Sequence, residues 1–290
     1  MARIEKLVIV GVGLIGGSFA LALKEAGVVG RVVGVGRGAS NIRRALELGI
    51  IDSGGSLDRE TLKDADLVLL AVPVRQMPAV MRSMAPLLDP GTVVTDAGST
   101  KQDVVELARR EFKASLARFV PGHPIAGTEK SGAEAAFAAL FRERKVVLTP
   151  LAENERGAIA RVRAAWEQCG ARVFEMQPQE HDAVLAAVSH LPHVLAFALV
   201  DLVAGSKDAE RLFSFAAGGF RDFTRIASSS PEMWRDICLA NREALLAELD
   251  RYRSELAAVR VLIESGDADG LRALFSRARE ARERWLKGVE

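Results

Sequence analysis

Leu7-Val8-Ile9-Val10-Gly11-Val12-Gly13-Leu14-Ile15-Gly16 is the stretch that decides the fold of this chain. A β-branched run leads into a G-x-G-x-x-G pattern, and an apolar, Ala-rich helical pattern follows from Phe19 to Ala26. In such a turn one glycine makes the tight bend, one lets the backbone approach a pyrophosphate, and one packs the helix on the strand. The free amides and positive dipole end of the helix then favour phosphate. The sequence therefore predicts a dinucleotide-binding turn rather than a purely structural one.

The residues expected to contact the dinucleotide come from the turn and from segments that follow the neighbouring strands. They are Gly11, Gly13, Leu14, Ile15, Gly16, Arg37, Ser40, Val72 and Pro73. NAD-selective folds end the second strand with an acidic residue about 20 residues past the glycines, where this chain has Gly36 and Arg37. No carboxylate there repels a 2′-phosphate, and Arg37 and Ser40 are placed to bind one, unless Arg37 is simply solvated surface. We expect NADP to be favoured over NAD, with use of both as the alternative.

Composition excludes several classes of partner. The chain has 290 residues, a hydrophobic fraction of 49% and a formal net charge of +1. No charge excess favours nucleic acid or a membrane surface, and the length predicts two domains. Cys169 and Cys238 lie far apart beside no His or Cys partner, which indicates a reducing compartment without disulfides or a zinc motif.

Membrane-targeting segments are not expected. The N-terminus leads directly into the first strand and leaves no room for a signal peptide. The longest apolar segment of helical type, residues 194–200, stops at Asp201 and is too short to span a bilayer. We expect a cytoplasmic protein.

The first part of the chain alternates strand and helix patterns. After the β-branched run, strands are expected at residues 31–35, 66–72, 92–96, 119–120, 146–149 and 172–176. Helices are expected at residues 40–48, with Ser40 as cap, after Pro73 through Leu88, and at 101–112 and 155–169. Gly27 and Gly49 are expected to end helices. This alternation predicts an α/β fold, with right-handed βαβ units and a doubly wound Rossmann-type sheet over residues 1–177.

From Gln177-Pro178 onward every periodic segment is helical, which predicts an all-helical second domain over residues 178–290. A heptad seam lies in a helix expected to start near Pro231, after cap candidates Ser228 to Ser230. The seam consists of Leu245, Leu249, Tyr252, Leu256, Val259 and Ile263. Such a seam packs either within one bundle or across a dimer interface, and the pattern leaves both open.

Chemistry is expected at the carboxyl ends of the strands, where open parallel sheets bind their ligands. Ser99 or Thr100 offers a hydroxyl between a strand and a helix, and a polar loop at 125–132 has glycines near both ends. His123 lies on a turn between two prolines, and its ordinary pKa suits a general base for an oxidised hydroxyl. The alternative is a histidine that only hydrogen-bonds its own turn.

The other histidines are His181, His190 and His193. On a straight helix His190 would point about 180° and His193 about 120° away from His181, so they would share no face as metal ligands. Pro192 is expected to kink or break that helix. No metal site is predicted.

Four further motifs follow the glycine-rich turn in order. They are residues 122–132 (GHPIAGTEKSG), 189–193 (SHLPH), 218–227 (GGFRDFTRIA) and 233–236 (MWRD). Together they resemble the prephenate/arogenate dehydrogenases of tyrosine biosynthesis, from about Val8 to beyond Asn241.

The resemblance implies a nucleotide domain, a helical domain that forms a homodimer, and an active site in the cleft between the two domains. It implies NAD(P)-dependent oxidative decarboxylation of prephenate to 4-hydroxyphenylpyruvate, or of arogenate to tyrosine. The catalytic positions it implies are His123, hydrogen-bonded to the ring hydroxyl, and Ser99, which contacts the same hydroxyl. The substrate-binding positions it implies are Arg225 at a carboxylate, His193 and Thr128 in the pocket, Glu129 and Asp222 at its mouth, and Trp234 as a wall.

Several alternatives remain open at this point. Prephenate is the first expectation, with arogenate or both substrates as the alternative. No regulatory domain is expected after the helix that ends near Lys287, so feedback by tyrosine would act at the active site. The rivals are a generic β-hydroxyacid dehydrogenase, in which a lysine usually takes the place of His123, and a non-catalytic nucleotide-sensing dimer.

Overall fold

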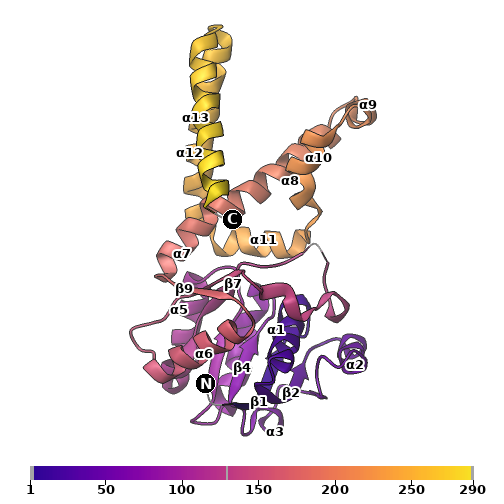
Figure 1. The fold of residues 1–290 in the computed structure, drawn as a ribbon, viewed down its shortest axis with the longest axis vertical. Coiled ribbons are helices and arrows are strands. Elements are labelled where there is room, and N and C mark those ends of the chain that lie inside the picture. Colours follow the sequence, from indigo (N-terminus) through magenta and orange to yellow (C-terminus); the bar gives the residue numbers. More distant parts are fainter. Residues whose placement is uncertain (1–2, 129, 289–290) are drawn as a thin grey trace. The chain divides into compact units, whose positions relative to one another are not determined.

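A computed structural model describes residues 3–128 and 130–288 of the chain. The described residues of 1–242 form one compact unit and those of 243–290 form a second. Figure 1 traces the chain through both units.

The first unit is built on a six-stranded parallel sheet in the order β3-β2-β1-β4-β5-β6. The strands are β1 (Ile4–Val10), β2 (Val29–Val35), β3 (Ser53–Gly55), β4 (Leu67–Leu70), β5 (Val93–Asp96) and β6 (Phe119–Val120). Val8 pairs with Val33 on one side and with Val68 on the other. The strand order reverses between β1 and β4, and doubly wound sheets bind their ligands outside the carboxyl ends of the strands at such a point.

Helices cover both faces of this sheet. They are α1 (Leu14–Glu25), α2 (Ala39–Glu47), α3 (Arg59–Leu62), α4 (Met77–Met84), α5 (Gln102–Glu111) and α6 (Arg156–Gln168). Leu7 and Ile9 of β1 face the cluster that contains Trp166 of α6, whereas Val8 and Val10 face the cluster that contains Met81 of α4. Because neighbouring strand residues point to opposite faces, β1 is apolar throughout. The helices α1 and α6 pack on the same face of the sheet, as Figure 1 shows.

A second, three-stranded sheet lies beside the first. It consists of β7 (Gly122–Pro124), β8 (Lys145–Leu148) and β9 (Arg172–Glu175), with β7 antiparallel and β9 parallel to β8. His123 therefore lies in a strand, paired with Val147, and not on the turn that its flanking prolines predicted. The last two strands expected from the sequence exist, but they do not extend the parallel sheet.

Short 3-10 turns fill the connections of this part of the chain. They are η1 (Val74–Gln76), η2 (Ala85–Leu87), η3 (Lys113–Arg118), η4 (Ala133–Ala135) and η5 (Ala138–Phe141). The expected helix after Pro73 is therefore a composite of η1, α4 and η2.

Of two serines expected at helix starts, one caps its helix and the other does not. Ser40 was expected to cap α2, but the cap is Gly38 and Ser40 lies within the first turn without a side-chain cap bond. Ser230 caps α11 (Pro231–Ala240) by accepting a hydrogen bond from the Met233 amide at 3.2 Å. Gly27 and Gly49 follow their helices with φ of 69° and 67°, a region that favours glycine.

The rest of the first unit is helical. It contains α7 (Pro178–Leu185), the π-helical turn η6 (Ala186–His190), α8 (Leu191–Ala204), α9 (Ala209–Ser214), α10 (Gly218–Thr224), the 3-10 turn η7 (Arg225–Ser228) and α11 (Pro231–Ala240). Pro192 does not break the helix as expected, because it lies in the first turn of α8, directly after the wider π turn.

The segments α7, η6 and α8 form one continuous helix of 27 residues, Pro178–Ala204. Its most apolar 18-residue window has a mean hydropathy of 1.9, so length and composition alone would allow it to cross a membrane. The expectation that the longest apolar helix is too short for this is therefore wrong. His181, Asp182 and His190 of this helix are nevertheless buried, as in a helix that packs on protein.

The second unit consists largely of α12 (Arg242–Glu264) and α13 (Ala268–Lys287). The heptad seam lies in α12. The single helix expected from Pro231 is instead broken between α11 and α12 at Asn241, which has a non-helical backbone (φ −102°, ψ 37°).

Candidate active site

The glycine-rich turn has the geometry that a pyrophosphate requires. Gly11 has a φ of 103°, and a Cβ there would lie 2.4 Å from the Ala71 carbonyl oxygen. A Cβ on Gly16 would lie 2.3 Å from the Gly11 carbonyl oxygen, so only glycine lets α1 approach the turn. A Cβ on Gly13, by contrast, would meet no described atom within 4 Å. Gly13 caps α1 without a side-chain bond, so open space lies in front of the first amides of the helix.

The end of β2 carries no carboxylate. Gly36, Arg37 and Ser40 are exposed there, beside the glycine-rich turn. Asn41 of α2 donates a hydrogen bond from Nδ2 to the Val12 carbonyl at 2.5 Å and so ties α2 to that turn. The chemistry available at this edge is therefore cationic and hydroxylic.

The remaining expected cofactor contacts lie in the same turn or in the segment after β4. Leu14 and Ile15 begin α1 and are half-buried, Val72 is half-buried after β4, and Pro73 is exposed. These positions leave backbone and apolar side chains accessible at the carboxyl ends of β1 and β4, as a bound dinucleotide requires.

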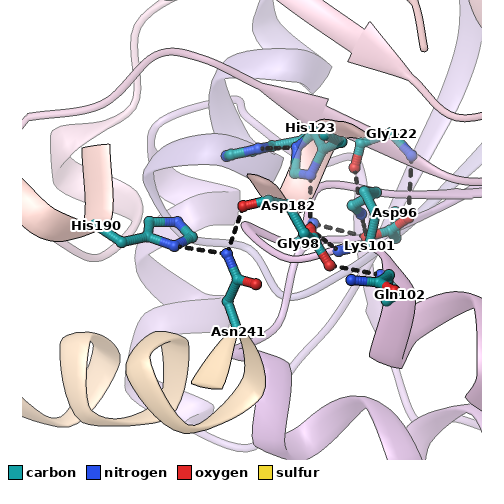
Figure 2. Close-up of polar contacts among 10 residues, drawn as sticks. Asp96, Gly98, Lys101, Gln102, Gly122, His123, Asp182, His190 and Asn241 are labelled. Atoms are coloured by element: carbon teal, nitrogen blue, oxygen red, sulfur yellow. Dashed lines mark hydrogen bonds and ion pairs between the residues drawn. The ribbon is translucent and has the colours of Figure 1, made fainter. Parts of the chain in front are cut away.

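A buried ion pair holds the strand that carries His123. Lys101 Nζ lies 2.5 Å from Asp96 Oδ2, and neither side chain is exposed. The same ammonium donates to the Gly122 carbonyl at 2.8 Å, while Asp96 Oδ1 accepts from the Gly122 amide at 3.0 Å. Both backbone groups of the residue before His123 are therefore fixed by one ion pair, as Figure 2 shows.

His123 is almost fully buried, and its partners come from α7. Its Nδ1 lies 2.8 Å from Nε2 of His181, whose own Nδ1 lies 2.8 Å from Oδ1 of Asp182. Asp182 in turn accepts the amides of Lys101 at 2.8 Å and Gln102 at 2.9 Å. These contacts form a buried line of hydrogen-bonded groups that runs from His123 on β7 through α7 to the start of α5.

Burial sets the protonation state of this line. It lowers the pKa of His123 well below the ordinary 6.5, and the nearby His181 and Lys101 lower it further. Burial also lowers the pKa of His181, although the hydrogen bond to Asp182 opposes that effect. Both imidazoles are therefore neutral near pH 7, and His123 can accept a proton.

Sequence reasoning missed His181 and Asp182 as parts of the site. They are 58 and 59 positions from His123, and the pattern around them is that of an ordinary amphipathic helix. The available signal was a His-Asp pair at the start of the first helix after the α/β region.

A second cluster gathers on α8, η7 and α11. The rings of His193 and Trp234 stack with centroids 3.6 Å apart, and Trp234 Nε1 is buried without a hydrogen-bond partner among the described residues. Burial lowers the pKa of His193 while its bond to the Ser189 carbonyl raises it, and the charge of Arg225 lowers it further. The turn η7, which begins at Arg225, packs on α8, which carries His193, while a shared substrate pocket stays a prediction.

The other expected site residues differ in how far they are exposed to solvent. Ser99 is half-buried in the loop between β5 and α5, whereas Thr100 is fully buried, so Ser99 is the accessible hydroxyl of the two. Thr128 is exposed in the loop after β7, and Asp222 is exposed on α10, 3.6 Å from Arg221. Glu129 lies outside the described residues.

His190 connects the two groups of side chains. Asn241 donates from Nδ2 to the Asp182 carbonyl at 2.8 Å and to His190 Nδ1 at 3.0 Å (Figure 2). His190 also lies edge-on to Trp234, with ring centroids 6.0 Å apart. On a straight helix, His181 and His190 were expected to lie on opposite faces. The structure has the wider π turn η6 between α7 and α8, and both histidines are buried. Within the described ranges no cluster of His, Cys, Asp and Glu is suited to a metal ion.

A parallel nucleotide-binding sheet beside a buried, neutral histidine is the arrangement of a dinucleotide-dependent oxidoreductase. Residues 19–175 match the family model of the prephenate dehydrogenase nucleotide-binding domain, and residues 177–277 match that of the prephenate dehydrogenase dimerisation domain. The chain therefore belongs to the prephenate dehydrogenase family of tyrosine biosynthesis. The expected fold class, with a helical dimerisation domain after the sheet, is confirmed, while the boundary at residue 177 stays a prediction.

Known proteins support this placement. The chain is 39% identical to the cyclohexadienyl dehydrogenase of Zymomonas mobilis, over 97% of this chain and 96% of that protein. It is 38% identical to the prephenate dehydrogenase of Bacillus subtilis, over 96% of this chain and 76% of that protein. The crystal structure of A. aeolicus prephenate dehydrogenase with hydroxyphenyl propionate and NAD+ is 38% identical, covers 97% of this chain and 98% of that chain, and superposes with a TM-score of 0.91. The expected enzyme class, an oxidoreductase with prephenate dehydrogenase activity, is confirmed.

Proposed function

We propose that the chain oxidises and decarboxylates prephenate to 4-hydroxyphenylpyruvate, with His123 as the general base. The observation that carries this proposal is the buried, neutral His123, with Nδ1 engaged by His181 and Nε2 left for a substrate. As Nε2 takes the ring hydroxyl proton, hydride leaves the same carbon. The ring carboxylate then departs as carbon dioxide and leaves its electron pair in the ring, and the resulting phenolate oxygen takes the proton back from His123. A dinucleotide bound at the glycine-rich turn supplies the hydride acceptor. The ring becomes aromatic, so the protein mainly orients the substrate and holds one proton between the two steps.

The substrate pocket proposed for this reaction uses both clusters. Ser99 contacts the ring hydroxyl from the loop before α5, and Arg225 binds a substrate carboxylate with its planar fork. Trp234 and His193 stack on each other and form an aromatic wall. Thr128 of the loop after β7 contributes to the pocket, and Asp222 of α10, which is exposed, contributes at its mouth.

Arg225→Gln tests the pocket. Removing the guanidinium should raise the KM for prephenate roughly 10- to 100-fold, because a charged hydrogen-bonding partner of the carboxylate is lost. An unchanged KM and kcat/KM would place the carboxylate elsewhere.

The second candidate substrate is arogenate, alone or together with prephenate. The similarity to a cyclohexadienyl dehydrogenase favours this candidate. Prephenate and arogenate differ only in whether the side chain carries a ketone or an ammonium group, so one pocket contact can separate them. The test is an absorbance assay at the nicotinamide band, in which each substrate is combined with each dinucleotide. The ratio of kcat/KM for prephenate and arogenate shows which substrate is preferred.

We propose that NADP is preferred over NAD. The support is the exposed Gly36-Arg37 pair and Ser40 at the end of β2, where no carboxylate repels a 2′-phosphate. The solved A. aeolicus relative contains NAD+, and NAD is therefore the alternative dinucleotide for this chain. The same crossed assay gives the ratio of kcat/KM for the two dinucleotides.

We also propose a homodimer through the helices after residue 177. The support is the match to a dimerisation domain and the exposed apolar side chains, among them Val188 and Leu202 on the long helix and Leu256 and Ile263 on α12. Analytical ultracentrifugation at micromolar concentration tests this, and a monomer would contradict it. A cytoplasmic location agrees with two cysteines that are free in the structure.

A further inference from the structure

His181 and Asp182 lie directly behind His123, and neither takes part in the reaction proposed above. Both are essentially inaccessible to solvent. Their hydrogen bonds determine which nitrogen of His123 carries a proton, because each group in the line can donate or accept only in certain protonation states.

The line starts from a carboxylate. Although burial raises it, the pKa of Asp182 is held below its ordinary value by the hydrogen bonds from His181 and from the amides of Gln102 and Lys101. An ionised carboxylate only accepts hydrogen bonds. His181 must therefore carry its proton on Nδ1, which lies 2.8 Å from Asp182 Oδ1.

The tautomer of His181 determines that of His123. Neutral His181 has one ring proton, already on Nδ1, so its Nε2 is an acceptor. The atom 2.8 Å away is His123 Nδ1, which must donate. His123 is itself neutral, so its Nε2 has no proton and presents a lone pair. The opposite tautomer of His123 would place two lone pairs against each other.

We propose that His181, oriented by Asp182, is a positioning residue that holds the proton of His123 on Nδ1 and makes Nε2 the proton acceptor of the reaction. This inference rests on the role proposed for His123 above. It gives His181 and Asp182 the orienting function that a carboxylate has toward the histidine of a Ser-His-Asp triad, with one more imidazole in the line.

The contacts of Asp182 support a second part of this role. Through the amides of Lys101 and Gln102 it holds the start of α5, next to the loop that carries Ser99. The Asp182 carbonyl is held by Asn241 at the end of α11. One residue of α7 thus connects the proposed base, the proposed serine loop and the helix that carries Trp234.

The tautomer can be measured in the unaltered enzyme. The chain has four histidines, so selective ¹⁵N-histidine labelling and long-range ¹H–¹⁵N correlation spectra resolve few signals, and His123→Asn identifies the pair from His123. At pH 7.5, without ligands, the proposal predicts a protonated Nδ1 and an unprotonated Nε2 for both His123 and His181. A proton on Nε2 of His123 would overturn it, whether or not any variant folds.

A matched pair of variants tests the effect on catalysis. His181→Leu removes the acceptor and frees the tautomer of His123, so kcat should fall about 10- to 100-fold while the prephenate KM and the dinucleotide Kd change less than about two-fold. His181→Gln returns an acceptor through Oε1, so kcat should recover to within about five-fold of the parent. In the ¹⁵N spectra His181→Leu should show a mixture of His123 tautomers. An equal loss of kcat in both variants, with the tautomer unchanged, would reduce His181 to a packing role.

Asp182→Ala adds an independent test. Without the carboxylate, no acceptor holds the His181 proton on Nδ1, so either nitrogen of His181 can carry it and the tautomer of His123 is no longer fixed. The kcat should fall at least as far as in His181→Leu, and the ¹⁵N spectra should show a mixture of His123 tautomers. A purely parent-like tautomer of His123 would contradict the proposal.

His123→Asn, assayed in parallel, separates the two hypotheses. If His123→Asn keeps near-normal kcat, the proposed function of His123 fails. If it loses activity while His181→Leu does not, His123 remains the base and only the positioning role of His181 fails.

Discussion

At the scale of single residues, the imidazole of His123 combines two properties that rarely occur together. It is buried enough to stay neutral, and its Nδ1 bond to His181 leaves a nitrogen for the substrate. A solvated histidine would be partly protonated near neutral pH and could rotate. Because Asp96 and Lys101 also hold Gly122 on both backbone groups, the position of His123 does not depend on its side-chain partners alone.

His123→Asn should lower kcat by about two to four orders of magnitude, because the general base is lost. Dinucleotide binding should be intact, since the glycine-rich turn is not touched. Steady-state kinetics with prephenate and a fluorescence titration of the dinucleotide measure the two effects. Near-normal turnover would remove His123 from the mechanism.

Arg37→Ala should raise the KM for NADP roughly ten-fold, because a charged hydrogen-bond donor to the 2′-phosphate is lost. The KM for NAD should change much less, since NAD has a hydroxyl in that place. Equal effects on both dinucleotides would show that Arg37 is only solvated surface. Arg43→Ala, an exposed arginine of α2, is the control for loss of a positive charge.

At the scale of elements, the parallel sheet is where sequence reasoning succeeds. Strand β4 is a buried apolar run that Pro73 follows, and β5 is buried along its whole length before the turn that leads into α5. Local pattern therefore predicts both strands. The break at Asn241 and the π turn η6 could not be predicted from the sequence. Both occur where Asn241 forms hydrogen bonds with Asp182 and His190, and contacts between residues so distant in the sequence leave no local pattern. The contact of His181 with His123 could not be predicted for the same reason, because it forms only when α7 packs on β7.

Two glycine variants separate the structural and binding roles of the turn between β1 and α1. Gly16→Ala should lower the unfolding free energy by about 1–3 kcal/mol, since its Cβ would press on the Gly11 carbonyl oxygen. Gly13→Ala should leave stability within about 0.5 kcal/mol, because no protein atom is met, yet weaken dinucleotide binding at least about ten-fold by occupying the space before α1. Urea unfolding and dinucleotide titrations check both variants. If Gly13→Ala binds like the parent, the pyrophosphate does not approach this amide.

At the scale of the whole molecule, all four histidines of the chain belong to one connected region. His123 contacts His181, Asn241 joins Asp182 to His190, and Trp234 joins His190 to His193. Burial lowers the pKa of each of these four imidazoles. The hydrogen bonds and ring contacts that hold the helices from α7 to α11 together are therefore built around neutral rings, and acid acts on the structure as well as on catalysis.

The sharpest consequence concerns His190, whose pKa burial lowers from 6.5 to about 4. Since the folded protein binds this proton less readily than the unfolded chain, stability is fully present above pH 6.5. It is lost as the pH falls from 6.5 through about 4, by roughly 3 kcal/mol for this residue alone. Urea unfolding at fixed protein concentration between pH 7.5 and 4.5 measures the loss. His190→Asn keeps an acceptor for Asn241 without a titrating group, so its stability should fall distinctly less over that range. An equal fall in both proteins would mean that His190 is already accessible to protons in the folded state.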